Sequence, residues 1–197
     1  MTMHRMKTTI SNIKIKALEE KVPIISADGL LFLKKAIKDY QVKDILEIGS
    51  AVGYSAIEMA QIANHVTTIE RDPQMVEKAK LNIKELGLEE KITLIFNDAL
   101  SDEINFEERF DLIFIDAAKA QYEKFFNKYA PYLKPTGIIV TDNLNFHHLD
   151  INRVSRGTKG LIKRLNAFKL FLQNHSDYET VFSDIGDGMS ISRRVTK

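Results

Sequence analysis

The sequence predicts an α/β fold: one sheet of five parallel strands extended by a C-terminal antiparallel hairpin, seven strands in all, with helices on both faces. Three observations support this prediction. Short apolar runs alternate with amphipathic helical patterns through short connections, as in a parallel sheet covered by helices. An early apolar run passes through two glycines directly into a helical pattern. Two alternating segments joined by IGDG close the chain, which is typical of a hairpin.

The elements are predicted in chain order from these patterns. The parallel strands are expected at Ile45–Ile48, Val66–Glu70, Ile92–Phe96, Leu112–Asp116 and Ile138–Asp142, and the hairpin strands at Tyr178–Ser183 and Met189–Val195. The later helices are expected at Tyr54–Ala63, Pro73–Leu86, Asp102–Glu108, Ala120–Tyr132 and Leu161–Asn174. This arrangement leaves no repeat and no interdomain linker.

The N-terminal part is less regular. Residues 1–16 are polar and basic and predict a lead-in without fixed structure. A short helix over Ala17–Val22 would end before Pro23, and Asp28 is expected to cap a helix that runs to Tyr40. We therefore expect a lead-in over residues 1–22 and a single domain over residues 23–197.

The composition narrows the functional classes. A chain of 197 residues with 44% hydrophobic and 28% charged residues is typical of a globular protein with its own core. The absence of cysteine excludes disulfides, thiolate metal sites and a cysteine nucleophile. With no bilayer-length apolar run and no signal-peptide pattern, we expect a cytoplasmic protein that does not contact membranes. The net charge of +1 leaves nucleic-acid binding to local patches.

The stretch DILEIGSAVGYSA, from Asp44 to Ala56, is a candidate ligand-binding turn. Glycines allow close backbone approach, and the following helix N-terminus offers unpaired N–H groups. A dinucleotide fingerprint would be G-x-G-x-x-G, whereas this turn is G-x-x-x-G with Glu47 just before Gly49. A carboxylate repels a pyrophosphate but suits an ammonium and a sulfonium, so the turn favours S-adenosylmethionine (SAM). Taken alone, such a turn also occurs as an ordinary strand-to-helix connection.

Carboxylates stand at or just past the ends of the five predicted parallel strands: Glu47, Glu70, Asp98, Asp116 and Asp142. Ligands of open α/β sheets bind beyond the carboxyl ends of the strands, so these side chains are expected to share one rim. Glu70 is placed for ribose hydroxyls, and Asp98 with Ala99 for the adenine. Each acid taken singly could equally cap a following helix.

The last two strand ends carry a candidate metal site. Asp116, Asp142 and Asn143 supply the hard oxygen ligands that suit Mg²⁺, although Asp142-Asn143 could also simply form a turn. Lys119 follows Asp116 by three residues, and a lysine beside a divalent cation can act as a general base.

The segments EIGSAVGYSA, TTIERD, NDAL, FDLIFIDAAKAQY, GIIVTDN and IGDGMSIS resemble the metal-dependent O-methyltransferases of the catechol and caffeoyl-CoA type, over about Val22–Val195. The likeness is greatest to the bacterial branch that methylates 5-hydroxyuridine at the wobble position of tRNA. The resemblance implies a Rossmann-like methyltransferase sheet, a homodimer, and SAM with Mg²⁺, or Mn²⁺ in its place. The implied SAM contacts are Ile25, Glu47, Gly49, Tyr54, Ser55, Glu70, Asp98 and Asp116. The implied metal ligands are Asp116, Asp142 and Asn143, and the implied base is Lys119.

The acceptor is expected to be tRNA. A basic run offers phosphate contacts through Arg153, Arg156, Lys159, Lys163 and Arg164. The alternative is a small catechol or a caffeoyl-CoA-like phenol, whose phosphates would also need positive charge. The loop that borders the acceptor pocket keeps Phe146, but it has His148 where the family usually has glycine. More distant alternatives are an NAD-dependent oxidoreductase and a cofactor-binding module without catalysis.

Overall fold

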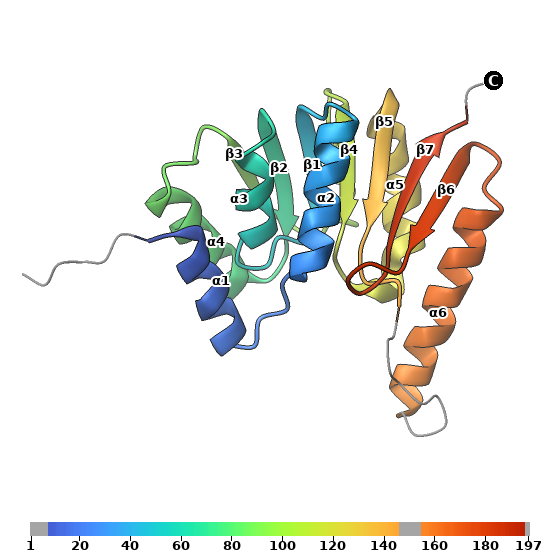
Figure 1. The fold of residues 1–197 in the computed structure, drawn as a ribbon, viewed down its shortest axis with the longest axis horizontal. Coiled ribbons are helices and arrows are strands. Elements are labelled where there is room, and N and C mark those ends of the chain that lie inside the picture. Colours follow the sequence, from blue (N-terminus) through green and yellow to red (C-terminus); the bar gives the residue numbers. More distant parts are fainter. Residues whose placement is uncertain (1–7, 146–154, 196–197) are drawn as a thin grey trace, which may run out of the picture.

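The computed structural model describes residues 8–145 and 155–195. These residues form a seven-stranded sheet with the order β3-β2-β1-β4-β5-β7-β6 (Figure 1). The strands are β1 (Asp44–Ile48), β2 (His65–Glu70), β3 (Ile92–Phe96), β4 (Phe110–Ile115), β5 (Leu133–Thr141), β6 (Tyr178–Ser183) and β7 (Met189–Arg194). Strands β1 to β5 pair in parallel, and β7 lies antiparallel between β5 and β6. The predicted fold class is confirmed.

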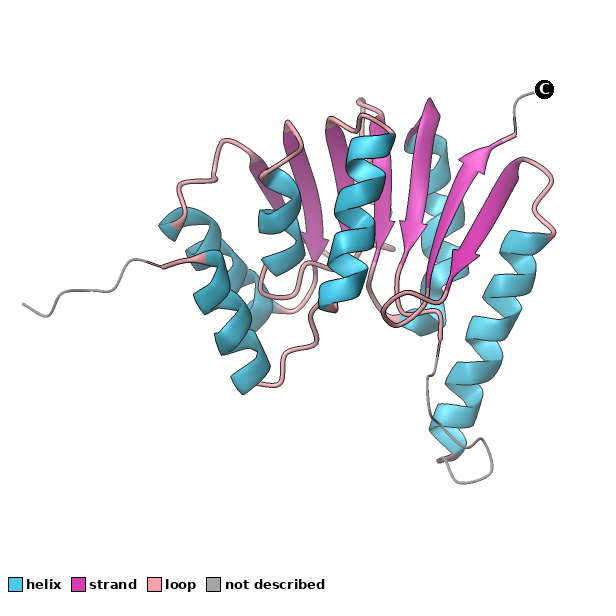
Figure 2. Ribbon diagram, viewed as in Figure 1, coloured by secondary structure: helices cyan, strands magenta, loops and turns pink. Residues whose placement is uncertain are grey.

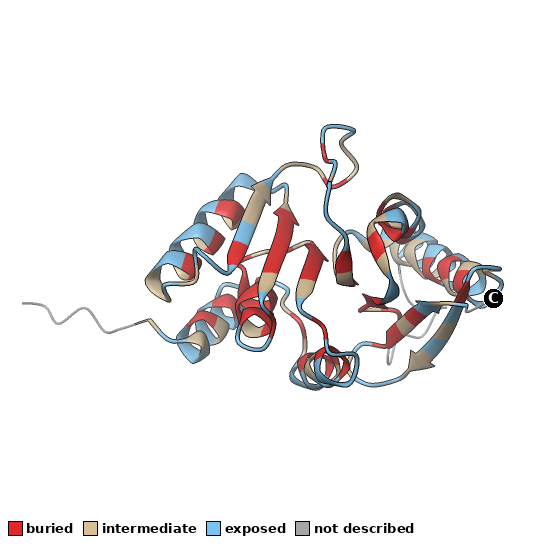
Figure 3. Ribbon diagram, turned by 90° about the horizontal axis from the view of Figure 1, so that it is seen from above, coloured by how far each residue is buried: buried red, intermediate tan, exposed pale blue. Residues whose placement is uncertain are grey.

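Helices cover both faces of this sheet (Figure 2). One face packs against α1 (Ile10–Glu19), α2 (Ala27–Asp39), α3 (Tyr54–Ala60) and α4 (Pro73–Glu85), and the other against α5 (Tyr122–Tyr129) and α6 (Arg156–Gln173). Short 3₁₀ turns, η1 (Lys119–Gln121) and η2 (Ala130–Tyr132), flank α5. Neighbouring residues of one strand serve opposite cores, since Ile45 belongs to the first and Leu46 to the second. Figure 3 shows the buried strands between the two helix layers.

The strand order reverses between β1 and β4, because β1 pairs with β2 on one side and with β4 on the other. Crossovers that leave in opposite directions open a crevice at the carboxyl ends of these strands. The turn after β1 and the acids after β4 and β5 therefore come to one end of the sheet. No helix in the described ranges is long and apolar enough to cross a membrane.

Three predictions about the N-terminal part were wrong. The helix predicted over Ala17–Val22 is only the last part of a helix that begins at Ile10 and ends at Glu19. Residues 10–19 form α1 rather than an unstructured lead-in, because Thr9 caps the helix and Ile13 and Ala17 bury one of its faces. The cap of α2 is Ser26, whose Oγ accepts a hydrogen bond from the Gly29 amide at 3.1 Å, whereas Asp28 lies in the first turn. The boundary between lead-in and domain at residue 23 stays a prediction.

Other boundaries also differ from the prediction. No helix forms over residues 102–108, where Ile104 is buried and the Phe106 ring packs on Phe110 at 5.1 Å, so short turns replace it. Helix α6 begins before the predicted Leu161 because Ser155 caps it and the chain continues helically through two glycines. Strand β5 starts at Leu133, ahead of the predicted Ile138.

Candidate functional site

The turn between β1 and α3 has an unusual backbone. Gly49, Ala51 and Gly53 all have positive φ, at 96°, 45° and 80°. A Cβ on Gly49 would lie 2.5 Å from the carbonyl oxygen of Asp116, so this position has room for glycine alone. The turn thereby brings the backbone of β1 directly against the end of β4.

Glu70, at the end of β2, holds this turn. Its Oε2 accepts a hydrogen bond from the Ala51 amide at 2.8 Å. Its Oε1 accepts from the amides of Arg71 at 2.8 Å and Asp72 at 2.9 Å. Beside it the Arg71 guanidinium donates to Asp98 at 3.2 Å, which ties the ends of β2 and β3 together. The Leu100 amide and then Arg71 hold the pKa of Asp98 below its usual value.

Glu47 lies within β1 and is fully buried. Its two oxygens accept hydrogen bonds from the hydroxyls of Ser55 at 2.5 Å and Thr68 at 2.6 Å. Burial raises the pKa of Glu47 to about 7 in spite of these bonds. The carboxyl is therefore protonated in part near neutral pH, and it stands behind the cavity wall with Ser55 between.

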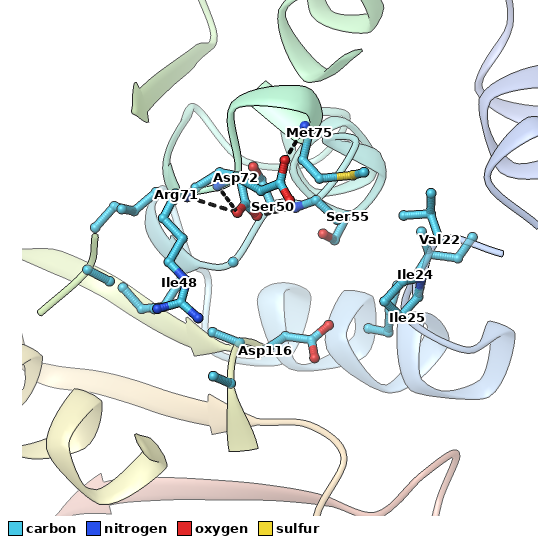
Figure 4. Close-up of a pocket in the computed structure, with 18 of the residues that line it drawn as sticks. Val22, Ile24, Ile25, Ile48, Ser50, Ser55, Arg71, Asp72, Met75 and Asp116 are labelled. Atoms are coloured by element: carbon cyan, nitrogen blue, oxygen red, sulfur yellow. Dashed lines mark hydrogen bonds between the residues drawn. The ribbon is translucent and has the colours of Figure 1, made fainter. Parts of the chain in front are cut away.

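A cavity of about 670 Å³ opens at this end of the sheet. Of the residues predicted to contact a cofactor, all except Glu47 line it: Ile25, Gly49, Tyr54, Ser55, Glu70, Asp98, Ala99 and Asp116. Figure 4 shows Val22, Ile24 and Ile25 facing the glycine turn across the cavity, with the Asp116 carboxylate pointing into the space between them. The cavity thus has an apolar wall opposite a polar one.

The cluster after β4 and β5 lies at the same cavity. Backbone bonds continue the parallel ladders, from Asp116 N to Ile48 O at 3.1 Å and from Asp142 N to Ile115 O at 3.2 Å. Asn143, with φ of 62°, donates from Nδ2 to Asp116 Oδ1 at 2.8 Å and accepts at Oδ1 from Lys119 Nζ at 3.0 Å. The structure therefore joins Lys119, Asp116 and Asn143 as the sequence predicts.

Asp142 completes this cluster from a fully buried position. Its Oδ1 accepts from the Asn143 amide at 2.6 Å, and the buried Tyr122 hydroxyl donates to its carbonyl oxygen at 3.0 Å. Within the described ranges, its Oδ2 is buried without a hydrogen-bond partner. An unpaired buried carboxylate oxygen is costly unless a cation or another donor meets it.

Burial raises the pKa of both Asp116 and Asp142, and repulsion between the two carboxylates adds to the rise for Asp142. The described residues hold no group of three or more histidine, cysteine, aspartate or glutamate side chains that could bind a metal. Asp116, Asp142 and the Asn143 amide nevertheless form a donor set of hard oxygens, in which Asp142 Oδ2 has no partner among the described residues. This donor set fits a divalent cation completed by water or substrate oxygens.

Some lining residues were missed by the sequence analysis. Ser50, Arg71, Asp72, Met75 and Asn97 line the cavity on the cofactor side, and Asp187 lines it from the loop between β6 and β7. The motifs TTIERD and IGDG contain Arg71, Asp72 and Asp187, so their positions beside predicted strand ends were a usable signal. The hydroxyl of Ser50 is buried without a partner in the described part of the chain.

Of the residues predicted near the acceptor, Phe146, His148 and Arg153 lie outside the described residues. The other basic residues of the predicted patch, Arg156, Lys159, Lys163 and Arg164, are exposed on the N-terminal half of α6.

The buried carboxyl of Glu47 predicts a pH-dependent stability. Its pKa is higher in the folded chain than the ordinary 4.5, so the folded state loses stability as pH rises from about 4.5 to about 7. Glu47→Gln removes this loss. The variant should gain about 2 kcal/mol more relative to wild type at pH 8 than at pH 5. Urea unfolding at both pH values measures this, with Glu89→Gln as an exposed control, and an equal effect of Glu47→Gln at both would show that the buried carboxyl is not responsible.

The sequence and the fold of this chain both have relatives among known proteins. Residues 4–195 match the O-methyltransferase family. The chain is 30% identical to the catechol O-methyltransferase of Niastella koreensis over 174 residues, covering 82% of this chain and 77% of that protein. A Staphylococcus aureus structure provisionally named as a caffeoyl-CoA O-methyltransferase is 38% identical with a TM-score of 0.89, covering 95% of this chain and 93% of the other. A Bacillus cereus O-methyltransferase in complex with SAH shares the fold at 21% identity and a TM-score of 0.82, covering 98% and 94%.

These matches favour methyl transfer over the hydride transfer of the oxidoreductase alternative. The family match spans nearly the whole chain, and the solved relatives share its sheet and helices. The chain belongs to the O-methyltransferase family, of the type that includes catechol and caffeoyl-CoA O-methyltransferases.

Proposed function

We propose that this protein transfers a methyl group from SAM to a hydroxyl of a small aromatic diol, with a divalent cation at Asp116, Asp142 and Asn143. One observation carries the proposal: the glycine turn and the oxygen cluster open into the same cavity of about 670 Å³. A donor and an acceptor bound to these two parts would meet across Asp116. Holding two reactants in line supplies much of the rate enhancement in such a transfer.

The polar groups beside the glycine turn support the proposal that SAM binds in that half of the cavity. Glu70 fixes the backbone of the turn at Ala51 and lies at the strand end from which ribose hydroxyls are bound. Asp98 stays ionised and could accept from an adenine amino group. Ser50 lines the cavity with a buried hydroxyl that has no partner among the described residues, and a polar ligand atom would satisfy it. A Bacillus cereus O-methyltransferase that shares the fold was solved in complex with SAH, which supports a SAM-type cofactor.

In the other half of the cavity, a divalent cation would be held by the oxygens of Asp116, Asp142 and Asn143. A bound Mg²⁺, or Mn²⁺ in its place, would supply Lewis-acid stabilisation of the acceptor oxygen. Lys119 stands with its Nζ 3.0 Å from Asn143 Oδ1, and it is the proposed base that takes the hydroxyl proton. The oxygen–methyl bond forms as the sulfur–methyl bond breaks, so the donor sulfonium becomes a neutral thioether.

The acceptor is proposed to be a small phenol because the named relatives of this chain act on, or are named for, catechol and caffeoyl-CoA. A second candidate is 5-hydroxyuridine at the wobble position of tRNA. One observation favours it: Arg156, Lys159, Lys163 and Arg164 expose positive charge on the half of α6 that begins at the site end of the sheet (Figure 1). A cytoplasmic homodimer also stays a prediction.

Two isosteric variants should separate the halves of the cavity. Asp142→Asn should lower Mg²⁺ affinity and turnover by about 100-fold while SAM affinity stays unchanged, since even outer partners of a metal ligand contribute about 10–100-fold. Asp98→Asn should weaken SAM binding about tenfold and leave Mg²⁺ affinity unchanged. Isothermal titration of each variant with SAM and with Mg²⁺ measures both. Parallel loss of both ligands in either variant would contradict this division of roles.

The acceptor can be determined with labelled SAM. We expect label to enter 3,4-dihydroxybenzoate in the presence of Mg²⁺ and not with a chelator, whereas 4-hydroxybenzoate, which lacks the second hydroxyl, should gain none. Bulk tRNA from a strain lacking this protein and caffeoyl-CoA are tested alongside. Chelator-sensitive label in tRNA alone would instead support the second candidate, and replacing Lys159 and Arg164 by glutamine should then weaken it.

A further inference from the structure

Asn145 lies two residues after the proposed metal ligand Asn143, at a point where three separate segments meet. Its side chain accepts at Oδ1 from Lys169 Nζ of α6 at 2.5 Å and donates from Nδ2 to Asp184 Oδ1 at 2.8 Å. Asp184 begins the loop between β6 and β7. One amide therefore connects a cation and an anion from opposite sides, in hydrogen bonds strengthened by charge at both ends.

The backbone around Asn145 is held by the same loop. The Leu144 amide donates to Gly188 O at 2.9 Å, and the Asn145 amide donates to Asp187 O at 2.8 Å. Gly188 has φ of 84°, and a Cβ there would lie 2.5 Å from Asn145 Cγ. The approach between loop and side chain is thus as close as the backbone allows.

This clamp bears directly on the cation site. Asn143 adopts a left-handed conformation with φ of 62°, which is uncommon outside glycine and persists where the surroundings impose it. Upstream, Tyr122 holds the Asp142 carbonyl at 3.0 Å. Downstream, the segment is held by Leu144 and by the Asn145 side chain.

We infer that Lys169, through Asn145 and Asp184, is a positioning residue that orients Asp142 and Asn143 for the cation. The inference rests on the proposed function, since it assigns Lys169 a part in metal binding. Lys169 itself contacts Asn145 and stands outside the set of oxygen ligands. Helix α6, which is anchored in the core by Leu165, Phe168 and Leu172, would in this way stabilise the geometry of the cation site.

The test uses the full chain and Mn²⁺ as the probe. Lys169→Met keeps most of the side-chain volume and removes the donor, Asn145→Ala removes the bridging amide, and Lys124→Met, an exposed lysine on α5, is the matched control. Free Mn²⁺ measured by electron paramagnetic resonance should show affinity about tenfold lower for Lys169→Met and unchanged for the control. The double variant should lose no more than Asn145→Ala alone, because Asn145→Ala already removes the hydrogen bond that Lys169 makes.

Two further readouts separate positioning from a general structural role. SAM affinity should stay as in wild type, and Lys169→Arg, which keeps a donor, should recover part of the Mn²⁺ affinity. Without any metal, the amides of Leu144 and Asn145 should exchange hydrogen faster in Lys169→Met than in wild type. Unchanged Mn²⁺ affinity, or equal loss of SAM and Mn²⁺, would overturn the inference. Wild type that binds no Mn²⁺ would instead contradict the proposed function. In that case, amide exchange in Lys169→Met that is as slow as in wild type would also rule out the positioning role.

Discussion

Asp116 and Asp142 follow neighbouring parallel strands, so the register of β4 and β5 brings two carboxyl groups together in a buried place. Burial raises the pKa of each of them, and the charge of Asp116 raises the pKa of Asp142 further. A folded protein retains such a pair only where something compensates it. Asn143 Nδ2 compensates Asp116, and Lys119 is joined to the pair through the same amide, but Asp142 Oδ2 remains without a partner in the described ranges. A divalent cation would compensate the negative charge of these two buried carboxyl groups.

The close packing of the strand ends also determines the shape of the cofactor side of the cavity. The end of β4 is reached by the turn after β1 because Gly49 leaves no Cβ against the Asp116 carbonyl. The Glu70 carboxylate at the end of β2 holds the turn at Ala51. The next residue, Arg71, donates to Asp98, which follows the neighbouring strand β3. A chain of short contacts therefore runs from β3 to β5 along one edge. The two halves of the cavity are positioned by one sheet, which lets a donor and an acceptor meet in a fixed relation.

Much of the fold and of the candidate site could be predicted from the sequence. The strand-end acids, the glycine turn and the terminal hairpin have local patterns that can be recognised even when the bounds of an element are wrong by a few residues. The pattern missed α1 because its buried residues Ile13 and Ala17 are diluted by lysines, and only packing shows which face is covered. The sequence predicts Glu47 as a SAM contact, and the structure shows its carboxyl bonded to Ser55 and Thr68 outside the cavity lining. Lys169, Asn145 and Asp184 lie far apart in the chain, so their junction depends on tertiary structure alone.

The most direct test of the proposed cation site is the number of protons that the protein releases when the cation binds. Titrating the protein with Mg²⁺ at pH 6.5 in two buffers of different ionisation enthalpy gives the number of protons exchanged. Since the raised pKa values leave protons on Asp116 and Asp142 in the metal-free protein, binding should release on the order of one proton per ion, and Asp142→Asn should lower this number. Binding without proton release, or release that Asp142→Asn leaves unchanged, would contradict the claim that the cation replaces protons on this buried pair.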